Sequence, residues 1–235
     1  MRCDVWWASP APATPRLLAL LDENERTRYG NYRREIDQLR FLTGRALIRA
    51  VAGQWLGVEP EAVRLDASCY DCGKPHGKPT VVGPGAPEVS ISHSGQRVAL
   101  AIARGAPLGV DVEEIRDAEV TDLARISFSE AERAAFAHVP EPELRAAFFT
   151  YWSRKEAVVK TTGKGMSVPM SQFTLTPHDA PPAVTASRTA EVDPAALRMA
   201  TLDPGDGYRA SLAVLTVEDL EVTEQPADDL IRALG

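Results

Sequence analysis

The sequence of 235 residues contains only three cysteines, Cys3, Cys69 and Cys72. An odd and small number excludes a framework of disulfides and is typical of a reducing compartment. No segment approaches the ~18 apolar residues that a membrane-spanning helix needs. The proline-rich segment Ser9 to Pro15 stands where a signal peptide would need a continuous apolar core. These absences predict a cytoplasmic protein that does not enter a membrane.

An excess of positive charge is also missing, because the formal net charge is -7. This value argues against general nucleic-acid binding. The charge is unevenly spread: seven arginines lie from Arg26 to Arg49 against only Glu35 and Asp37, a local charge of +5. A small anion responds to such a local group, since salt screens charges beyond ~8 Å. The segment predicts either a phosphate site, which the planar arginine fork suits, or a solvated helix face.

The apolar spacing predicts two long helices, each followed by glycine, at 35–56 and 144–162. Strands are predicted at 88–94, 96–103, 108–115 and 207–217, the last of which closes the chain. The first three follow one another closely, which favours an antiparallel meander. Loops rich in proline with glycine or alanine are predicted at 69–85 and 177–194.

A weak internal repeat appears when Gly95 to Ala101 is aligned with Gly207 to Ala213, where four of seven residues agree. The predicted long helices precede these segments at similar distances, 50 residues from Arg45 and 52 from Lys155 to the first glycine. A repeat of this kind predicts two lobes of similar structure.

The expected fold class is therefore α+β, with two similar lobes that each pack an antiparallel sheet on a long helix. The N-terminal lobe is expected at 1–105 and the C-terminal lobe at 106–235. At 235 residues with 44% hydrophobic composition, the chain can bury such cores. We expect the active site in a cleft between the lobes, a usual place for a ligand.

Three carboxylates lie on elements that could converge. Asp111 and Glu113 point to one face of their predicted strand, about 7 Å apart. Trp152, Glu156 and Lys160 form one stripe of a helix at i, i+4 and i+8. Such oxygen ligands suit a hard cation. The alternative is ordinary: a solvated strand end and a surface ion pair worth a few tenths of a kcal/mol.

Two other patterns allow more than one interpretation. Cys69 and Cys72 with His76 resemble half of a zinc site, which needs four ligands, but free thiols in a loop or a redox pair are alternatives. Ser129 and Glu132 have the spacing of a helix-capping box, although Ser127 and Glu130 compete for that role.

Taken together, the motifs resemble those of the 4'-phosphopantetheinyl transferases, in particular the two-lobed Sfp type. The resemblance extends from about Arg26 to Leu175, and the last predicted strand agrees with it. It depends on six motifs in the family's order: Phe41-Leu42-Thr43-Gly44-Arg45, His76-Gly77-Lys78-Pro79, Ile91-Ser92-His93-Ser94-Gly95, Gly109-Val110-Asp111-Val112-Glu113, Phe128-Ser129-Glu130-Ala131-Glu132, and the segment Trp152 to Lys160 with Gly163-Lys164-Gly165.

The resemblance implies a holo-carrier-protein synthase that transfers the phosphopantetheine arm of coenzyme A to a serine and releases adenosine 3',5'-bisphosphate. It implies Mg²⁺ ligands at Asp111, Glu113 and Glu156, and a diphosphate contact at Lys160. Glu156, Lys160 and Glu113 are the expected catalytic residues. Glu156 is the first candidate for the base that takes the serine proton, with Glu113 or a metal-bound water as alternatives. Glu132 matches a family acid near the metal, or serves only as a helix cap.

For coenzyme A the resemblance implies a set of binding residues that joins the 3'-phosphate side to the diphosphate side: Arg40, Arg45, Gly77, Lys78, Ser92, His93, Asp111, Lys155 and Lys160. Arg28 matches a family lysine only loosely. The cysteine pair before Gly77 departs from the family pattern, and no role is carried over to it.

The expected partners are coenzyme A and acyl or peptidyl carrier proteins, without nucleic acid or membrane, and the protein is expected to be a monomer. One alternative is a non-catalytic module that binds coenzyme A or a carrier protein. Another is a small zinc protein built on Cys69 and Cys72.

Overall fold

The computed structural model describes all residues from 1 to 235, which form two compact units. The first unit contains 2–105 and the C-terminal segment 222–235. The second unit contains 106–221 and the first residue. The C-terminal segment thus does not belong to the lobe expected at 106–235, because its strand joins the sheet of the first unit. No helix is both long and apolar enough to cross a membrane.

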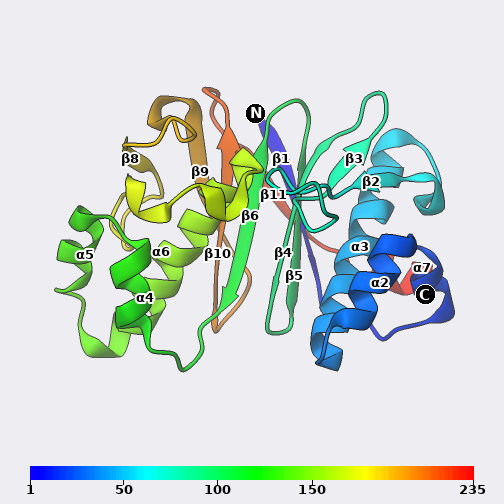
Figure 1. The fold of residues 1–235 in the computed structure, drawn as a ribbon, viewed down its shortest axis with the longest axis horizontal. Helices are drawn as coiled ribbons and strands as arrows, with labels where there is room; N and C mark the ends of the chain where they lie inside the picture. Colours follow the sequence, from blue (N-terminus) through cyan, green and yellow to red (C-terminus); the bar gives the residue numbers. More distant parts are fainter. The chain divides into compact units, whose positions relative to one another are not determined.

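The first unit has a four-stranded sheet, a separate hairpin and four α-helices, three of them short (Figure 1). Its elements are β1 (Arg2–Ala8), α1 (Pro15–Ala19), α2 (Glu23–Asn31), α3 (Glu35–Leu56), β2 (Arg64–Asp66), β3 (Thr80–Val82), β4 (Glu88–Ser94), β5 (Arg97–Ala103), β11 (Glu221–Pro226) and α7 (Asp228–Leu234). The strand order of the sheet is β11-β1-β5-β4, and β2 pairs with β3. The sequence patterns missed β1, α1, α2, β2, β11 and α7. The prediction of a loop at 69–85 is wrong at its end, where β3 forms.

Helix α3 has the predicted bounds and forms the centre of the core of the first unit. It ends at Gly57, whose φ of 68° is the left-handed conformation that glycine adopts without strain. The helix packs on β4 and β5, with α1, α2 and α7 also against it. Leu42 and Leu47 are among its fully buried side chains. Burial of such side chains contributes about 1.5–3 kcal/mol each.

The second unit has a three-stranded sheet, a two-stranded sheet and three α-helices (Figure 1). Its elements are β6 (Leu108–Glu114), α4 (Val120–Ser127), α5 (Glu130–Phe136), α6 (Glu141–Thr162), β7 (Phe173–Leu175), β8 (Val184–Ser187), β9 (Leu197–Leu202) and β10 (Tyr208–Leu215). The strand orders are β6-β10-β9 and β7-β8. Helix α6 begins three residues before the predicted start, at Glu141 instead of Leu144, and is followed by Gly163 in the left-handed conformation.

The expected meander of β4, β5 and β6 is wrong in its last step. β4 and β5 do form an antiparallel pair, but the other edge of β5 pairs with β1. That edge is therefore occupied, and β6 pairs instead with β10 in the second unit. The prediction of an α+β fold with antiparallel sheets is confirmed. The two segments of the weak repeat lie largely on β5 and β10, and the repeat itself stays a prediction.

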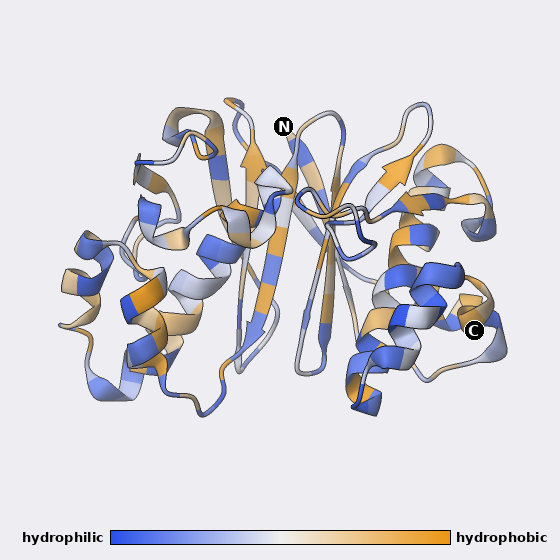
Figure 2. Ribbon diagram, in the orientation of Figure 1, coloured by the Kyte–Doolittle hydropathy of each residue, from blue (hydrophilic) through white to orange (hydrophobic).

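The core of the second unit is a cluster of aromatic rings against α6. Phe128 lies 4.9 Å from Tyr151 and 5.6 Å from Phe148 between ring centroids, and Phe136 meets Phe128 edge-on at 5.3 Å. Such pairs add about 0.5–1.5 kcal/mol beyond their buried area. On the side of α6 away from these rings lies β6, and Figure 2 shows that this strand alternates between hydrophobic and hydrophilic residues. The helix thus lies between the aromatic cluster and the sheet.

Gly109 lets α6 lie directly on the backbone of β6. A Cβ atom at this position would be 2.0 Å from the carbonyl oxygen of Ala157 and 2.7 Å from Cβ of Lys160. Real Cβ contacts are not this short, so any side chain would push the helix away from the strand. The glycine therefore sets the distance between the two elements that carry the predicted carboxylates.

We predict that Gly109→Ala destabilises the protein by about 1–3 kcal/mol, because the added methyl group meets backbone and not a flexible side chain. Urea unfolding of the purified protein measures this change. Gly30→Ala is the matched control, since α2 leaves nothing within 4 Å of a Cβ at this position. That change should stabilise by about 0.5–1 kcal/mol. Equal effects of the two substitutions would contradict the packing argument.

Candidate active site

One face of β6 carries the candidate residues, and α6 covers that face. Gly109, Asp111 and Glu113 alternate along the strand, and each meets a residue of α6. The hydroxyl groups of Ser153 on α6 and Ser211 on β10 lie 3.0 Å apart, and Ser211 is the register partner of Asp111. The helix is therefore fixed to the sheet at the level of Asp111.

Asp111 and Lys160 form an ion pair at this surface. The ammonium nitrogen of Lys160 lies 2.7 Å from Oδ1 of Asp111 and also donates to the carbonyl oxygen of Val110 at 3.0 Å. The Asp111 side chain is almost fully buried, whereas a quarter of the Lys160 side chain is exposed. Lys160 can therefore neutralise Asp111 and still present part of its charge to a ligand.

Glu156 lies on the same stripe of α6, one turn before Lys160. Burial is the main cause that raises the pKa of its carboxyl group, and the negative charge of Asp111 raises it further, while Lys160 acts in the opposite direction. Two carboxylates that repel each other in a partly buried place are stabilised by a cation between them. A raised pKa also brings a carboxylate nearer to the value that a general base needs at neutral pH.

Glu113 is the third carboxylate of this set. The indole Nε1 of Trp152 donates to its Oε1 at 3.2 Å, and Arg209 is its register partner on β10. Helix α6 therefore runs antiparallel to β6: Trp152 meets Glu113, and Lys160, two helical turns later, meets Asp111 and Gly109. The set offers oxygen atoms only, and such hard ligands fit Mg²⁺.

Lys155 is a structural residue, which corrects its expected contact with coenzyme A. Its side chain is 0% exposed. The ammonium group uses its three hydrogens on the carbonyl oxygens of Met170 and Phe173, at 2.7 and 2.8 Å, and on Glu132 at 2.9 Å. Burial lowers its pKa to about 8 although Glu132 opposes the shift, so the charged form still dominates at pH 7. No hydrogen remains for a phosphate.

Glu132 is the capping residue of α5. Its Oε2 accepts from the backbone N–H of Ser129 at 2.7 Å, and the Ser129 hydroxyl accepts from the N–H of Glu132 at 3.3 Å. Ser129, and not Ser127, is therefore the N-cap. The other oxygen, Oε1, accepts from the N–H of Leu175 at 2.8 Å. With Lys155 as well, these contacts account for the buried carboxylate without a metal.

Four of the seven arginines of the arginine-rich segment form ion pairs within the first unit, and the pairing of Arg45 corrects its expected phosphate role. Glu25 lies 3.0 Å from Arg45 and binds Arg49 through both oxygens, at 3.2 and 2.7 Å. Arg45 is 5% exposed, and burial lowers its pKa to about 10 against the influence of Glu25. Asp37 likewise pairs with Arg34 and Arg40.

Glu25 was missed because it lies one residue before the segment in which the arginines were counted. A signal for it exists: Asp22 and Glu25 have capping-box spacing, and both hydrogen bonds of the box are present. Its second role, as partner of two arginines about twenty residues later, has no local signature.

The other predicted residues of the first unit lie around the end of β4. Arg40 donates to the carbonyl oxygen of Gly95 at 2.8 Å, two residues beyond His93. His93 is half-buried and Ser92 is buried on β4, while Lys78 is half-buried two residues before β3. β3 and β4 contact each other. The structure thus brings β3, β4 and Arg40 together within one unit.

Gly77 has a packing reason of its own. A Cβ atom there would be 2.4 Å from the carbonyl oxygen of Ser68, while the N–H of Gly77 donates to the carbonyl oxygen of Ala67 at 2.7 Å. The glycine therefore closes the loop between β2 and β3 immediately before Lys78.

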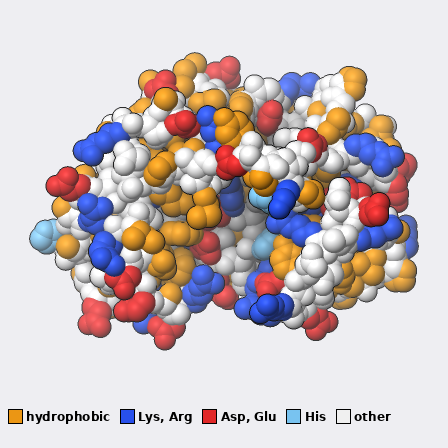
Figure 3. Space-filling view, in the orientation of Figure 1, with side chains coloured by type: hydrophobic (Ala, Val, Ile, Leu, Met, Phe, Trp, Pro, Cys, Tyr) orange, Lys and Arg blue, Asp and Glu red, His pale blue; other side chains and the backbone are white.

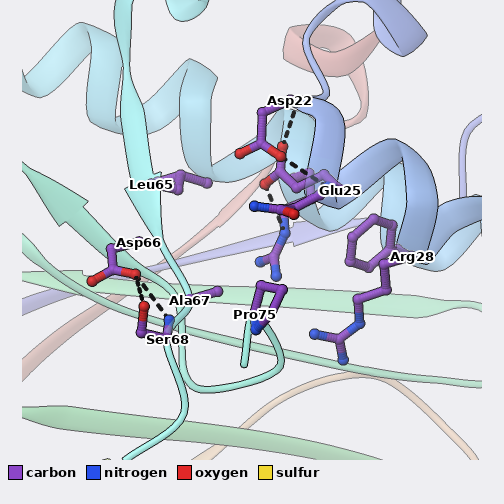
Figure 4. Close-up of a pocket in the computed structure, with 11 residues that line it drawn as sticks. Asp22, Glu25, Arg28, Leu65, Asp66, Ala67, Ser68 and Pro75 are labelled. Carbon is purple, nitrogen blue, oxygen red and sulfur yellow. Dashed lines mark hydrogen bonds and ion pairs between the residues drawn. The ribbon is translucent and has the colours of Figure 1, made fainter. Parts of the chain in front are cut away.

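A pocket of the first unit opens between α2, α3 and the loop after β2 (Figure 4). Figure 4 shows Glu25 and Arg28 on one side of it, and Ser68 and Pro75 of the loop on the other. Its remaining lining includes Arg45 and Phe41, whose ring lies 5.5 Å from the Arg28 guanidinium carbon. Arg28 is thus the more accessible arginine of this pocket.

We predict that Lys155→Met destabilises the protein by about 3–5 kcal/mol, because it leaves Glu132 buried without its counter-charge. Urea unfolding measures the change. Adding Glu132→Gln should restore part of the loss, since the two residues are coupled. Lys164→Met removes a surface pair with Glu191 and should cost less than about 1 kcal/mol. A Lys155 variant as stable as the Lys164 variant would refute the structural assignment.

Comparison with known proteins identifies the family. The family model of the 4'-phosphopantetheinyl transferase superfamily matches residues 107–213. The 4'-phosphopantetheinyl transferase psf-1 of Bacillus pumilus is 32% identical over 197 residues, 79% of each chain. HetI of Nostoc sp. is 29% identical over 204 residues, 84% of this chain and 80% of its own. Sfp of Bacillus subtilis is 27% identical over 165 residues, 69% of each chain. This chain belongs to the 4'-phosphopantetheinyl transferase family and is a transferase of the holo-carrier-protein synthase type.

Proposed function

We propose that this transferase uses coenzyme A and Mg²⁺ to place phosphopantetheine on a serine of an apo acyl or peptidyl carrier protein. The second product would be adenosine 3',5'-bisphosphate. One observation carries the proposal: Asp111 and Glu113 on β6 face Glu156 and Lys160 on α6, within the segment that the family model matches.

Asp111, Glu113 and Glu156 would hold the magnesium ion. Their fit is supported by the all-oxygen donor set and by the repulsion between Asp111 and Glu156, which a divalent cation would relieve. When bound, the ion would neutralise charge on the diphosphate that is broken.

The reaction forms one P–O bond, breaks another and transfers one proton. The serine oxygen forms a bond to the phosphorus that carries pantetheine, and the bond from this phosphorus to the oxygen of the adenosine-side phosphate breaks. Glu156 is the first candidate to accept the serine proton, because its raised pKa favours protonation, and Glu113 is the alternative. Lys160, which retains exposed surface, would stabilise charge on the diphosphate.

The nucleotide end of coenzyme A would be bound by the first unit. Arg40, Lys78 and His93 supply cationic or hydrogen-bonding groups, and Ser92 and the backbone near Gly77 supply further ones. Support comes from their placement, since Arg40 reaches the end of β4 that carries His93. Arg28 lies on the wall of the pocket in Figure 4 and is more accessible than the buried Arg45, so it is the better candidate for binding a phosphate there.

The carrier protein would dock on exposed apolar side chains of the second unit. Ile126 and Leu123 of α4 are 68% and 39% exposed, and Met166 is fully exposed. Figure 3 shows hydrophobic side chains at the surface over α4. Large apolar side chains exposed at a surface are typical of interaction sites when they are contiguous, as Leu123 and Ile126 are on α4.

We predict that Glu156→Gln raises the melting temperature of the metal-free protein at pH 7 and above. The folded-state pKa of Glu156 is raised, so its ionised form costs stability above that pKa. The cost disappears as pH falls below the unfolded value of ~4.3, where the two proteins should melt alike. Calorimetry across pH checks this.

Mg²⁺ should raise the melting temperature of the wild-type protein more than that of the Glu156 variant, since a ligand that binds only the native state stabilises it. Glu143→Gln is the matched control, because Glu143 is exposed on the first turn of the same helix. It should neither raise the melting temperature nor change the response to Mg²⁺. An identical Mg²⁺ response in wild type and the Glu156 variant would refute the metal assignment.

The transfer itself is tested by mass spectrometry. Incubation with coenzyme A, Mg²⁺ and a panel of apo carrier proteins should increase the mass of a carrier by one phosphopantetheine group. Asp111→Asn should slow transfer roughly 100-fold or more, the usual loss for one electrostatic stabiliser. Glu114→Gln is the control, because the Glu114 side chain on β6 points away from Asp111 and accepts a hydrogen bond from the Tyr208 hydroxyl at 3.3 Å. No mass gain on any carrier would overturn the proposed function.

A further inference from the structure

The loop between β2 and β3 gathers three metal-binding side chains outside the candidate active site. One ligand atom each from Cys69, Cys72 and His76 lies within 4.8 Å of the other two. The Sγ of Cys72 and the Nε2 of His76 are 3.0 Å apart. The group contains two sulfurs and one imidazole nitrogen, which are the ligands of zinc sites.

The backbone of the loop is shaped around the first cysteine. Gly73 donates its N–H to the carbonyl oxygen of Cys69 at 2.9 Å and has a φ of 69°, which suits glycine. This turn brings the sulfur atoms of Cys69 and Cys72 into one group with the imidazole of His76, which favours metal binding over two separate thiols.

Much of the loop is exposed to solvent. Tyr70 is 68% exposed, and Cys72 and His76 are exposed. Its ends are joined by two backbone hydrogen bonds, from Cys69 to Lys74 at 2.8 Å and from Gly77 to Ala67 at 2.7 Å. An exposed loop gains order when a metal links its side chains.

We propose that Cys69, Cys72 and His76 bind one zinc ion, with the fourth position open to water or an external ligand. In a tetrahedral site with Zn–S bonds of ~2.3 Å, two sulfurs lie roughly 3.8 Å apart, so small side-chain rotations close the present group to bonding distance. The Cys72 and His76 contact is then two ligands of one ion. The proposal does not depend on the transferase reaction, and its test needs neither coenzyme A nor a carrier protein.

The test uses the full-length protein, reduced by a phosphine that does not compete strongly for zinc. Equilibrium dialysis against Zn²⁺ and metal analysis should show one zinc per chain. Substitution by Co²⁺ should give the intense visible bands of a tetrahedral site and a thiolate charge-transfer band. Less than stoichiometric uptake, or a Co²⁺ spectrum without thiolate charge transfer, would overturn the site.

Variants locate the ion. Cys72→Ser and His76→Ala should each weaken zinc binding by more than ~10-fold, since each removes one of three ligands. Cys3→Ala and His138→Ala are the matched controls, because Cys3 is buried on β1 and His138 is exposed after α5. Both should bind zinc as wild type does. Equal zinc affinity of the Cys72 and Cys3 variants would show adventitious binding and refute the proposal. The proposal would also be refuted if Cys69 and Cys72 formed a disulfide and the protein still bound no zinc after reduction of that disulfide.

Discussion

The contact between the backbone of Ala157 and Gly109 is the constraint on which the candidate active site depends. The axes of two packed helices normally lie about 8–10 Å apart because side chains separate the backbones. Here the strand has no Cβ at the contact, and the helix descends onto it. At that short distance Lys160 reaches both Asp111 and the carbonyl oxygen of Val110. The candidate active site thus depends on the absence of a side chain at Gly109.

Buried cations fix the opposite side of each long helix. In the first unit Glu25 caps α2 and binds Arg45 and Arg49 of α3; in the second, Glu132 caps α5 and binds Lys155 of α6. In both cases a capping glutamate of a short helix serves as counter-ion for the long helix. A buried charge without a partner is costly, so each pair sets the register between two helices. The aromatic cluster alone would tolerate more sliding, because apolar contacts are not directional.

Much of this fold could be predicted because local sequence patterns determine where its long helices and several of its strands form. The bounds of α3 followed from apolar spacing and the glycine after it, and β4 and β5 from alternation. The pairing of β6 could not be predicted from proximity, since β1 and β10 come from distant parts of the chain and decide which strand edges are free. The terminal segment was missed for the same reason: β11 is a partner of β1.

Roles of single residues were harder to predict than the place of the site. Lys155 and Glu156 are adjacent in one motif, but a helix turns ~100° per residue, so the two side chains leave α6 in different directions. One enters the core and meets Glu132, and the other stays near Asp111. The arginines of α3 show the same effect. Formal charge counts them alike, whereas Arg45 is buried and paired with Glu25. A motif therefore marks where chemistry can occur, and the partner of each buried charge decides which of its residues are left to perform it.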